Sequence, residues 1–256
     1  MLLRSRCFGR EVPPPTGPED SGGSATSGTM GMRTQTRFYG LILLGLLVTA
    51  GNARSQQTTV PDLNGIPSGN GWTVMNRDAT VDTENGRTVV TFDGRLGDGA
   101  AWLQGVDFHD GTIEVLIRGK DVRGRSFVGV AFRGVDDETY DAVYFRPFNW
   151  MADNELNRSH GVQYISHPVN TWAKLREEHT GVYEAPVPNP PDPNGFFKAR
   201  IEIEKPTIRV FVNDDAEPCL VVEELTDRQG GRVGLWMGNT SDGSFAELKL
   251  TPAGGN

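Results

Sequence analysis

Short runs in which apolar and polar residues alternate follow one another from residue 72 to residue 250. An alternation of period two places the two kinds of side chain on opposite faces of a β-strand, and valine, isoleucine and aromatic residues favour strands. Glycine, asparagine, aspartate and proline separate the runs, as is typical of turns. The predicted strands are 72–75, 87–92, 100–103, 111–118, 126–133, 140–146, 161–166, 196–204, 207–213, 219–222, 232–238 and 244–250.

This series of about twelve short strands with almost no helix predicts an all-β sandwich or barrel. Only residues 170–179 have a pattern that allows a helical turn or two. Residues 176–195 contain five prolines, so we expect this insertion to stay outside the sheets. A loop of that length is uncommon unless it is functional or disordered.

The first part of the chain lacks the alternation. Residues 1–29 are rich in proline, glycine, serine and threonine, which predicts a disordered leader or a wrongly assigned gene start. Residues 30–53 contain two arginines, then an apolar run, then small residues, which is the order of a secretory signal peptide. The apolar run is too short for a comfortable membrane span. The alternative is a cytoplasmic tail with an apolar helix.

The sequence therefore predicts an exported protein, periplasmic or extracellular, with a linker or N-terminal arm over 54–71 and one sandwich domain over 72–251. Six of the 25 Lys and Arg and three of the 33 Asp and Glu lie at or before residue 54, so the remainder carries a net charge of −11. Such a domain lacks the basic stripe that a nucleic acid requires and fits a neutral or cationic ligand better. Cys219 stands alone after the predicted cut, so no internal disulfide is possible there.

One predicted strand has an unusual polar face. Tyr144 and Arg146 lie opposite Val143 and Phe145 in the run 140–146, and an aromatic loop follows. A face that carries both a phenol and a guanidinium is suited to a wet cleft rather than to a core. The alternative is that Arg146 pairs with an acid such as Glu184 and only holds the sheet together.

The same alternation assigns residues of neighbouring strands and loops to this cleft. Aromatic faces cover the apolar C–H patches of a sugar ring, whereas Arg, Asn and Gln bond its hydroxyls. We therefore expect a saccharide ligand, with ordinary core aromatics as the alternative. The candidate ligand-binding residues are Arg133, Tyr144, Arg146, Asn149, Gln163, Trp172, Arg176 and Trp236.

The stretches "FRG…YDAVYFRPFN" and "GRVGLWMG…SDGSFAELKL" resemble the 3-keto-disaccharide hydrolase-like domains, over roughly residues 72–250. Those are exported bacterial domains related in fold to laminarinase-type glycoside hydrolases. The resemblance implies a concanavalin A-like jelly roll of two antiparallel sheets. The chain departs from the family pattern because it has "FVGVAFRG" where an "NSG" segment usually follows the central strand.

The catalytic motif of laminarinase-type enzymes, Glu-x-Asp-x-x-Glu, is absent. Glu202 and Glu204 come nearest, but Thr207 takes the place of the third acid, and solvated strand charges explain the pair. Whether the protein is an enzyme or a non-catalytic glycan-binding or envelope adhesion module therefore stays open.

A 3-keto sugar needs other chemistry, namely a general base and an electrophile for the enolate. His160 and Glu184, which lie on either side of the predicted helical turn, are the catalytic candidates. Related sandwiches often carry calcium, and Asp242 in "NTSDGS" is the candidate ligand because Ca²⁺ prefers oxygen donors. The same residues also form an ordinary turn.

Overall fold

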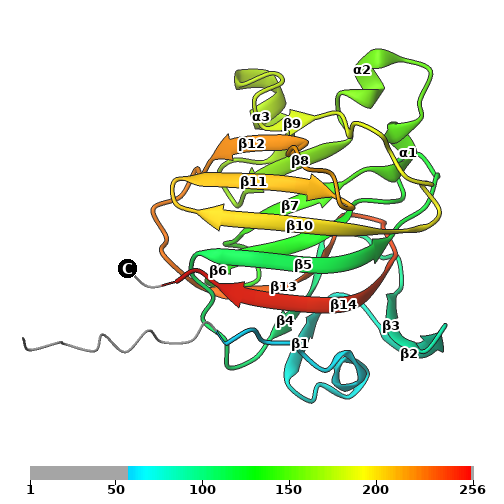
Figure 1. Ribbon diagram of the computed structural model, residues 1–256, viewed down its shortest axis with the longest axis vertical. Coiled ribbons are helices and arrows are strands. Elements are labelled where there is room, and N and C mark those ends of the chain that lie inside the picture. Colours follow the sequence, from blue (N-terminus) through cyan, green and yellow to red (C-terminus); the bar gives the residue numbers. More distant parts are fainter. Residues whose placement is uncertain (1–56, 255–256) are drawn as a thin grey trace, which may run out of the picture. The chain divides into compact units, whose positions relative to one another are not determined.

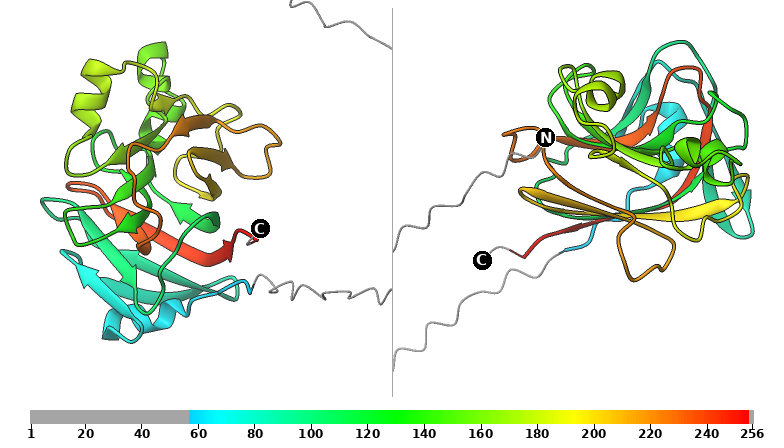
Figure 2. Two further views of the ribbon diagram at one scale, coloured as in Figure 1. Left: turned by 90° about the vertical axis from the view of Figure 1, so that its left-hand side faces the viewer. Right: turned by 90° about the horizontal axis from the view of Figure 1, so that it is seen from above.

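The computed structural model describes residues 57–254, so the predicted leader and signal segments lie outside the described residues. The described chain forms two seven-stranded antiparallel sheets that lie face to face (Figure 1, Figure 2). The all-β jelly-roll sandwich predicted from the sequence is confirmed. Within the described range, no helix has both the length and the apolar character needed to cross a membrane.

The first sheet has the strand order β1-β4-β13-β6-β7-β8-β9, and the second has the order β12-β11-β10-β5-β14-β3-β2. The strands of the first sheet are β1 (Trp72–Met75), β4 (Gly99–Leu103), β13 (Arg232–Met237), β6 (Val128–Gly134), β7 (Asp141–Phe145), β8 (Val162–Ser166) and β9 (Glu184–Ala185). Those of the second are β12 (Leu220–Glu223), β11 (Thr207–Val212), β10 (Phe196–Glu204), β5 (Gly111–Arg118), β14 (Gly243–Pro252), β3 (Arg87–Phe92) and β2 (Ala79–Glu84). Four short helices are η1 (Leu63–Ser68), α1 (Pro147–Trp150), α2 (Glu155–Arg158) and α3 (Trp172–Glu178).

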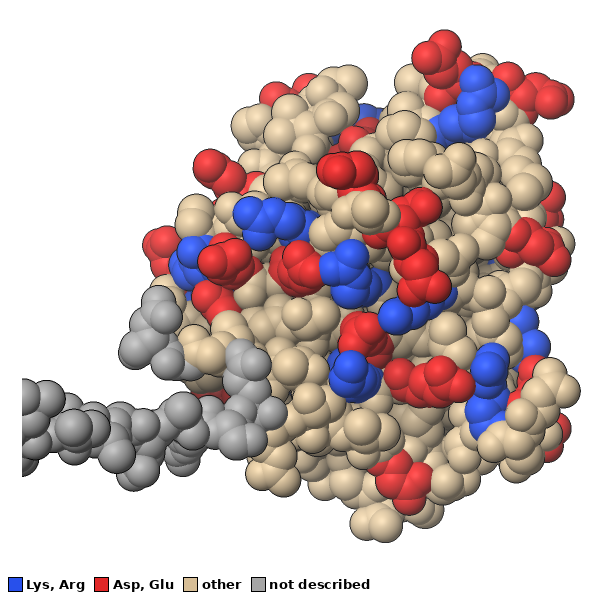
Figure 3. Space-filling model, viewed as in Figure 1, with Lys and Arg blue, Asp and Glu red and all other residues tan. Residues whose placement is uncertain are grey.

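The main core lies between the two sheets and explains the alternation of the second sheet. Along β5, Ile113, Val115 and Ile117 are buried in this core, whereas the residues between them are half-buried. The outer face of the second sheet carries interspersed acidic and basic side chains (Figure 3). Cross-strand pairs form there, for example Glu114 with Lys198 at 3.0 Å and with Lys249 at 2.8 Å.

The central strands of the first sheet, in contrast, are buried on both faces. Every residue of β6, β7 and β8 is buried. On the face turned away from the second sheet, aromatic side chains form a second cluster that includes Trp102, Tyr140, Tyr144 and Trp236, and Leu175 of α3 covers it. A strand in this position must carry large side chains on both faces, which accounts for Tyr144 opposite Val143 and Phe145.

The predicted strand bounds match the structure to within one or two residues, with two strands missed. The sequence of β2, "ATVDTE", is too polar to signal a strand, yet β2 pairs with β3 along its whole length. The proline-rich insertion, predicted to contain no sheet, contributes the two-residue strand β9, in which Glu184 pairs with Gln163 and Ala185 with Val162.

The segment 57–71 is part of the folded domain rather than a linker. Thr59 pairs with Leu250, and Leu63 and Ile66 of η1 are buried in the main core.

Arg133 does not share a face with Tyr144 and Arg146, contrary to the sequence prediction. The β6–β13 pairing shifts register between Arg232 and Gly234, and Arg133 has a φ of 52°, in the left-handed region. The bulge breaks the alternation and turns Arg133 toward the far end of the sandwich, where it is fully buried.

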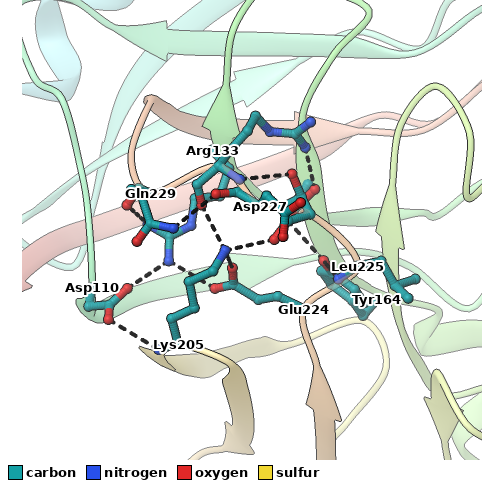
Figure 4. Close-up of polar contacts among 11 residues, drawn as sticks. Asp110, Arg133, Tyr164, Lys205, Glu224, Leu225, Asp227 and Gln229 are labelled. Carbon is teal, nitrogen blue, oxygen red and sulfur yellow. Dashed lines mark hydrogen bonds and ion pairs between the residues drawn. The ribbon is translucent and has the colours of Figure 1, made fainter.

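There Arg133 joins a network of ion pairs that connects the two sheets (Figure 4). Its Nη2 lies 2.6 Å from Asp110 and 2.9 Å from Glu224, and Lys205 Nζ lies 3.3 Å from Glu224. Glu224 directly follows β12 and its side chain is completely buried. Two cations and two carboxylates balance here, so the role of Arg133 in the structure is to hold the sandwich together.

We predict that Arg133→Met destabilises the fold by about 3–5 kcal/mol, because it leaves the buried Glu224 carboxylate without its guanidinium partner. Urea unfolding measures the change. The matched control is Arg209→Met, which removes an arginine paired with Glu204 on the exposed face of β11. Surface changes of this kind usually stay within about 0.5 kcal/mol. Equal unfolding midpoints for the two variants would contradict the structural role of Arg133.

Candidate functional site

A cavity of about 500 Å³ opens on the face of the first sheet that is turned away from the second sheet. Its floor includes Tyr144 of β7 and Trp236 of β13. Its walls come from the segment before β6, from α1, from the segment before β8 and from α3. We call this cavity the sheet pocket.

A hydrogen-bonded triad of polar side chains lies at the base of the sheet pocket. Tyr144 and Gln163 face each other across the β7–β8 pair, and the Tyr144 hydroxyl donates to Gln163 Oε1 at 2.9 Å. Arg146 Nη2 donates to the Tyr144 hydroxyl at 2.6 Å and also to Gln163 Oε1. Burial raises the pKa of Tyr144 to about 12, so its hydroxyl stays protonated and remains a donor.

The absence of a side chain at Gly129 of β6 leaves space for Tyr144. The two residues pair across the strands, and a Cβ at Gly129 would lie only 2.1 Å from the Val143 carbonyl oxygen and 2.8 Å from Tyr144 Cβ. A side chain at this position would therefore push the β7 backbone and the phenol out of place.

Three cationic or basic groups lie around the Glu184 carboxylate at one wall of the sheet pocket. Arg176 binds it in bidentate fashion, with Nε 3.0 Å from Oε1 and Nη2 2.7 Å from Oε2. His160 Nδ1 lies 2.8 Å from Oε2, close but not aligned as a hydrogen bond, and Arg146 Nη1 lies 3.7 Å from the same oxygen. The short strand β9 holds this carboxylate against β8.

Burial lowers the pKa of His160, and the positive charges of Arg176 and Arg146 act in the same direction, whereas Glu184 opposes the shift. Burial likewise lowers the pKa of Arg146, although a guanidinium stays protonated in proteins. At neutral pH the sheet pocket therefore contains a neutral imidazole beside a buried guanidinium.

Aromatic rings line the remainder of the sheet pocket. Trp172, at the start of α3, is 49% exposed, and the Arg176 guanidinium lies 5.2 Å from its ring. Trp236 donates from Nε1 to the Tyr140 hydroxyl at 3.1 Å, which fixes the indole. Phe127, just before β6, also lines the pocket, and its ring packs edge-on against the ring of Phe148 of α1.

The structure brings most of the sequence-predicted site residues together. Asn149 donates from Nδ2 to the His160 carbonyl at 3.2 Å and lines the pocket, while Gln163 and Glu184 hold residues that line it. The roles of these residues in binding or catalysis stay predictions. The residues around the sheet pocket are Tyr144, Arg146, Asn149, His160, Gln163, Trp172, Arg176, Glu184 and Trp236.

Sequence reasoning missed other lining residues, among them Asp98, Arg123, Phe127 and Phe148. Asp98 and Arg123 lie in loops far from β7 in sequence, and no local pattern marks them. Phe148 was not among the candidates, although the aromatic character of the loop after β7 is a signal that could have identified it.

The prediction of calcium at Asp242 stays a prediction. The Asp242 carboxylate is paired with Lys120, whose Nζ lies 2.5 Å away. Ca²⁺ takes six to eight oxygen ligands. Within residues 57–254, no group of three or more His, Cys, Asp or Glu side chains is placed to hold a metal ion.

No protein-family model matches this sequence, and neither does any curated protein. Solved structures do match in fold. The exoplasmic/lumenal domain of VIP36 is 12% identical in its metal-free form, with a TM-score of 0.52 over 79% of this chain and 94% of that domain. Its Ca²⁺-bound form is 13% identical, with a TM-score of 0.50 over 78% of this chain and 92% of that domain. The carbohydrate-binding module CBM66 from Bacillus subtilis is 18% identical, with a TM-score of 0.49 over 71% and 96% of the two chains.

At these identities the likeness establishes the fold alone, a jelly-roll sandwich of two antiparallel sheets. The VIP36 likeness supports that assignment.

Proposed function

We propose that this protein binds a saccharide in the sheet pocket. The observation that carries the proposal is the combination, around one cavity, of exposed aromatic surface with fixed hydrogen-bond donors. The cavity volume of about 500 Å³ lies within the range of small-molecule sites, which are mostly apolar with a few placed polar groups.

A sugar ring matches both components of this lining. Its C–H faces are apolar and stack on rings such as the half-exposed indole of Trp172. Its hydroxyls need donors and acceptors at fixed positions, and Arg146, Asn149 and His160 line the same cavity. Because Tyr144 and Gln163 hold Arg146, the guanidinium is set in place before a ligand arrives, which reduces the entropy lost on binding.

One solved structure with a similar fold contains a bound sugar. The VIP36 domain has also been solved in a Ca²⁺/Man2-bound form. That is a property of VIP36, and the proposal for this chain depends on its own pocket.

A second candidate function is cleavage of a 3-keto glycoside, and the His160–Glu184 contact favours it. The ketone acidifies the adjacent C–H, so neutral His160 would take that proton and Arg146 would stabilise the enolate oxygen. The electron pair then forms a C=C bond as the glycosidic C–O bond breaks. The protonated imidazole returns its proton to the leaving alkoxide, and addition of water to the unsaturated sugar completes hydrolysis.

We also propose that the protein is exported. The support is the basic, apolar and small-residue order of residues 30–53.

Calorimetric titration against a glycan panel tests the binding proposal. We expect Trp172→Ala to weaken saccharide binding by about tenfold, since aromatic contacts contribute about 0.5–1.5 kcal/mol beyond area burial. Arg146→Met is expected to weaken it by tenfold or more, because a hydrogen bond to a charged group contributes about 1.5–3 kcal/mol. The control Val221→Ala changes an exposed residue of the second sheet and should leave affinity unchanged. Binding that both pocket variants retain in full would contradict the site.

Product detection with 3-keto-glycosides tests cleavage. His160→Gln should lower the rate by about 10² to 10⁴, the usual contribution of a general base. Because burial lowers the pKa of His160 from the ordinary histidine value of about 6.5, the imidazole is still neutral at a pH of about 6.5. We therefore expect kcat/KM to be flat near pH 7 and to fall only at pH values below about 6.5. The absence of turnover in the wild type would eliminate this second candidate.

Cell fractionation with N-terminal sequencing tests export. We expect the exported form to begin near residue 54, after the small residues that end at Ala53. A cytoplasmic protein that retains residues 30–53 would contradict the proposal.

A further inference from the structure

The charges around the sheet pocket do not balance. Arg123, Arg146 and Arg176 line it, whereas the acids are Asp98 on the lining and Glu184 behind it. Burial lowers the pKa of both lining histidines, so neither is charged at neutral pH. The surroundings therefore carry a net charge of about +1, within a chain whose formal net charge is −8.

The uncompensated charge is concentrated at Arg146. Its side chain is 5% exposed, and its hydrogen bonds go to neutral acceptors, namely the His160 carbonyl, the Tyr144 hydroxyl and Gln163 Oε1. The nearest carboxylate oxygen, Glu184 Oε2, lies 3.7 Å away and is already 2.7 Å from Arg176. A buried charge is costly unless it is paired, so an anionic group on the ligand would find a prepared partner here.

We infer that the saccharide bound in the sheet pocket carries a carboxylate, as a hexuronic acid does, and that this carboxylate lies against Arg146 and Arg176. The inference rests on the proposed function and specifies its ligand class. Both arginines line the sheet pocket, and both approach the same oxygen of Glu184, so their positive charges meet at one place beside the cavity. Hydrogen bonds from a guanidinium to a carboxylate are charge-assisted and stronger than neutral ones.

The magnitude of the local charge selects among anions. One carboxylate would bring the net charge near the pocket to zero. A phosphate monoester, with about −1.5 to −2 charges at pH 7, would exceed it. A sulfate ester carries a single negative charge, as a carboxylate does, so an experiment must distinguish a sulfated sugar from a uronic acid.

Matched sugars test the inference by calorimetry in 50 mM NaCl. Each comparison sets a neutral trisaccharide (cellotriose, galactotriose or mannotriose) against the same trimer oxidised at C6 of its non-reducing residue only, so that each uronate carries a single carboxylate. Sulfated galactotriose is the further arm. We expect the uronate of at least one pair to bind at least tenfold tighter than its neutral partner, with the advantage shrinking at 0.5 M NaCl because salt screens charge.

Two pocket variants change the local charge in opposite directions. Arg176→Gln lowers it to about zero, and we expect the uronate advantage to fall below threefold. Glu184→Gln raises it to about +2, and the advantage should persist or grow. Gln at position 176 keeps a hydrogen-bond donor for the buried Glu184 carboxylate, and urea unfolding of the variant checks that the fold is retained. The control Arg209→Gln removes an equal charge on the second sheet and should leave the advantage unchanged.

Each outcome decides between the two proposals. Equal binding of a uronate and its neutral partner would overturn the carboxylate inference and leave saccharide binding standing. Preference for the sulfated sugar over every uronate would overturn the carboxylate assignment. Failure of the wild type to bind any sugar in the panel and in these pairs would overturn both.

Discussion

The candidate site depends on one constraint, a buried guanidinium on the far face of the first sheet. Arg146 comes directly after β7, and burial there would be unfavourable without partners. Tyr144 and Gln163 accept its hydrogen bonds, and the β7–β8 register fixes those two side chains opposite each other. Arg146 lines the sheet pocket, so in the proposed saccharide complex its position would set where the polar groups of the ligand bind.

The sequence was sufficient to predict those strands in which apolar and polar residues alternate regularly. Alternation sorted Tyr144, Gln163 and Trp236 onto one face, because each lies in a regular strand whose other face fills the core between the sheets. It also predicted the strands 196–204 and 207–213, which the structure pairs as the hairpin of β10 and β11. Binary pattern is a strong predictor wherever strand geometry is regular.

The pattern failed where the backbone departs from regular geometry or where a contact is distant. Arg133 left the predicted face because a bulge inserts a residue out of register, and nothing in "FRGV" marks it. Glu184 reached the site through a two-residue strand within a proline-rich insertion. Asp98 and Arg123 come from loops whose approach to β7 depends on the whole sandwich. Such positions are set by tertiary packing, which local propensity does not encode.

Arg133 and Arg146 are both buried but differ in how their charge is balanced. Arg133 contacts two carboxylates, and the nearby Lys205 pairs with the same Glu224, so that network is neutral without any ligand. Arg146 shares one carboxylate with Arg176 and otherwise contacts neutral oxygens. The carboxylate of the proposed ligand would give Arg146 a partner of the kind that Arg133 has in Asp110 and Glu224.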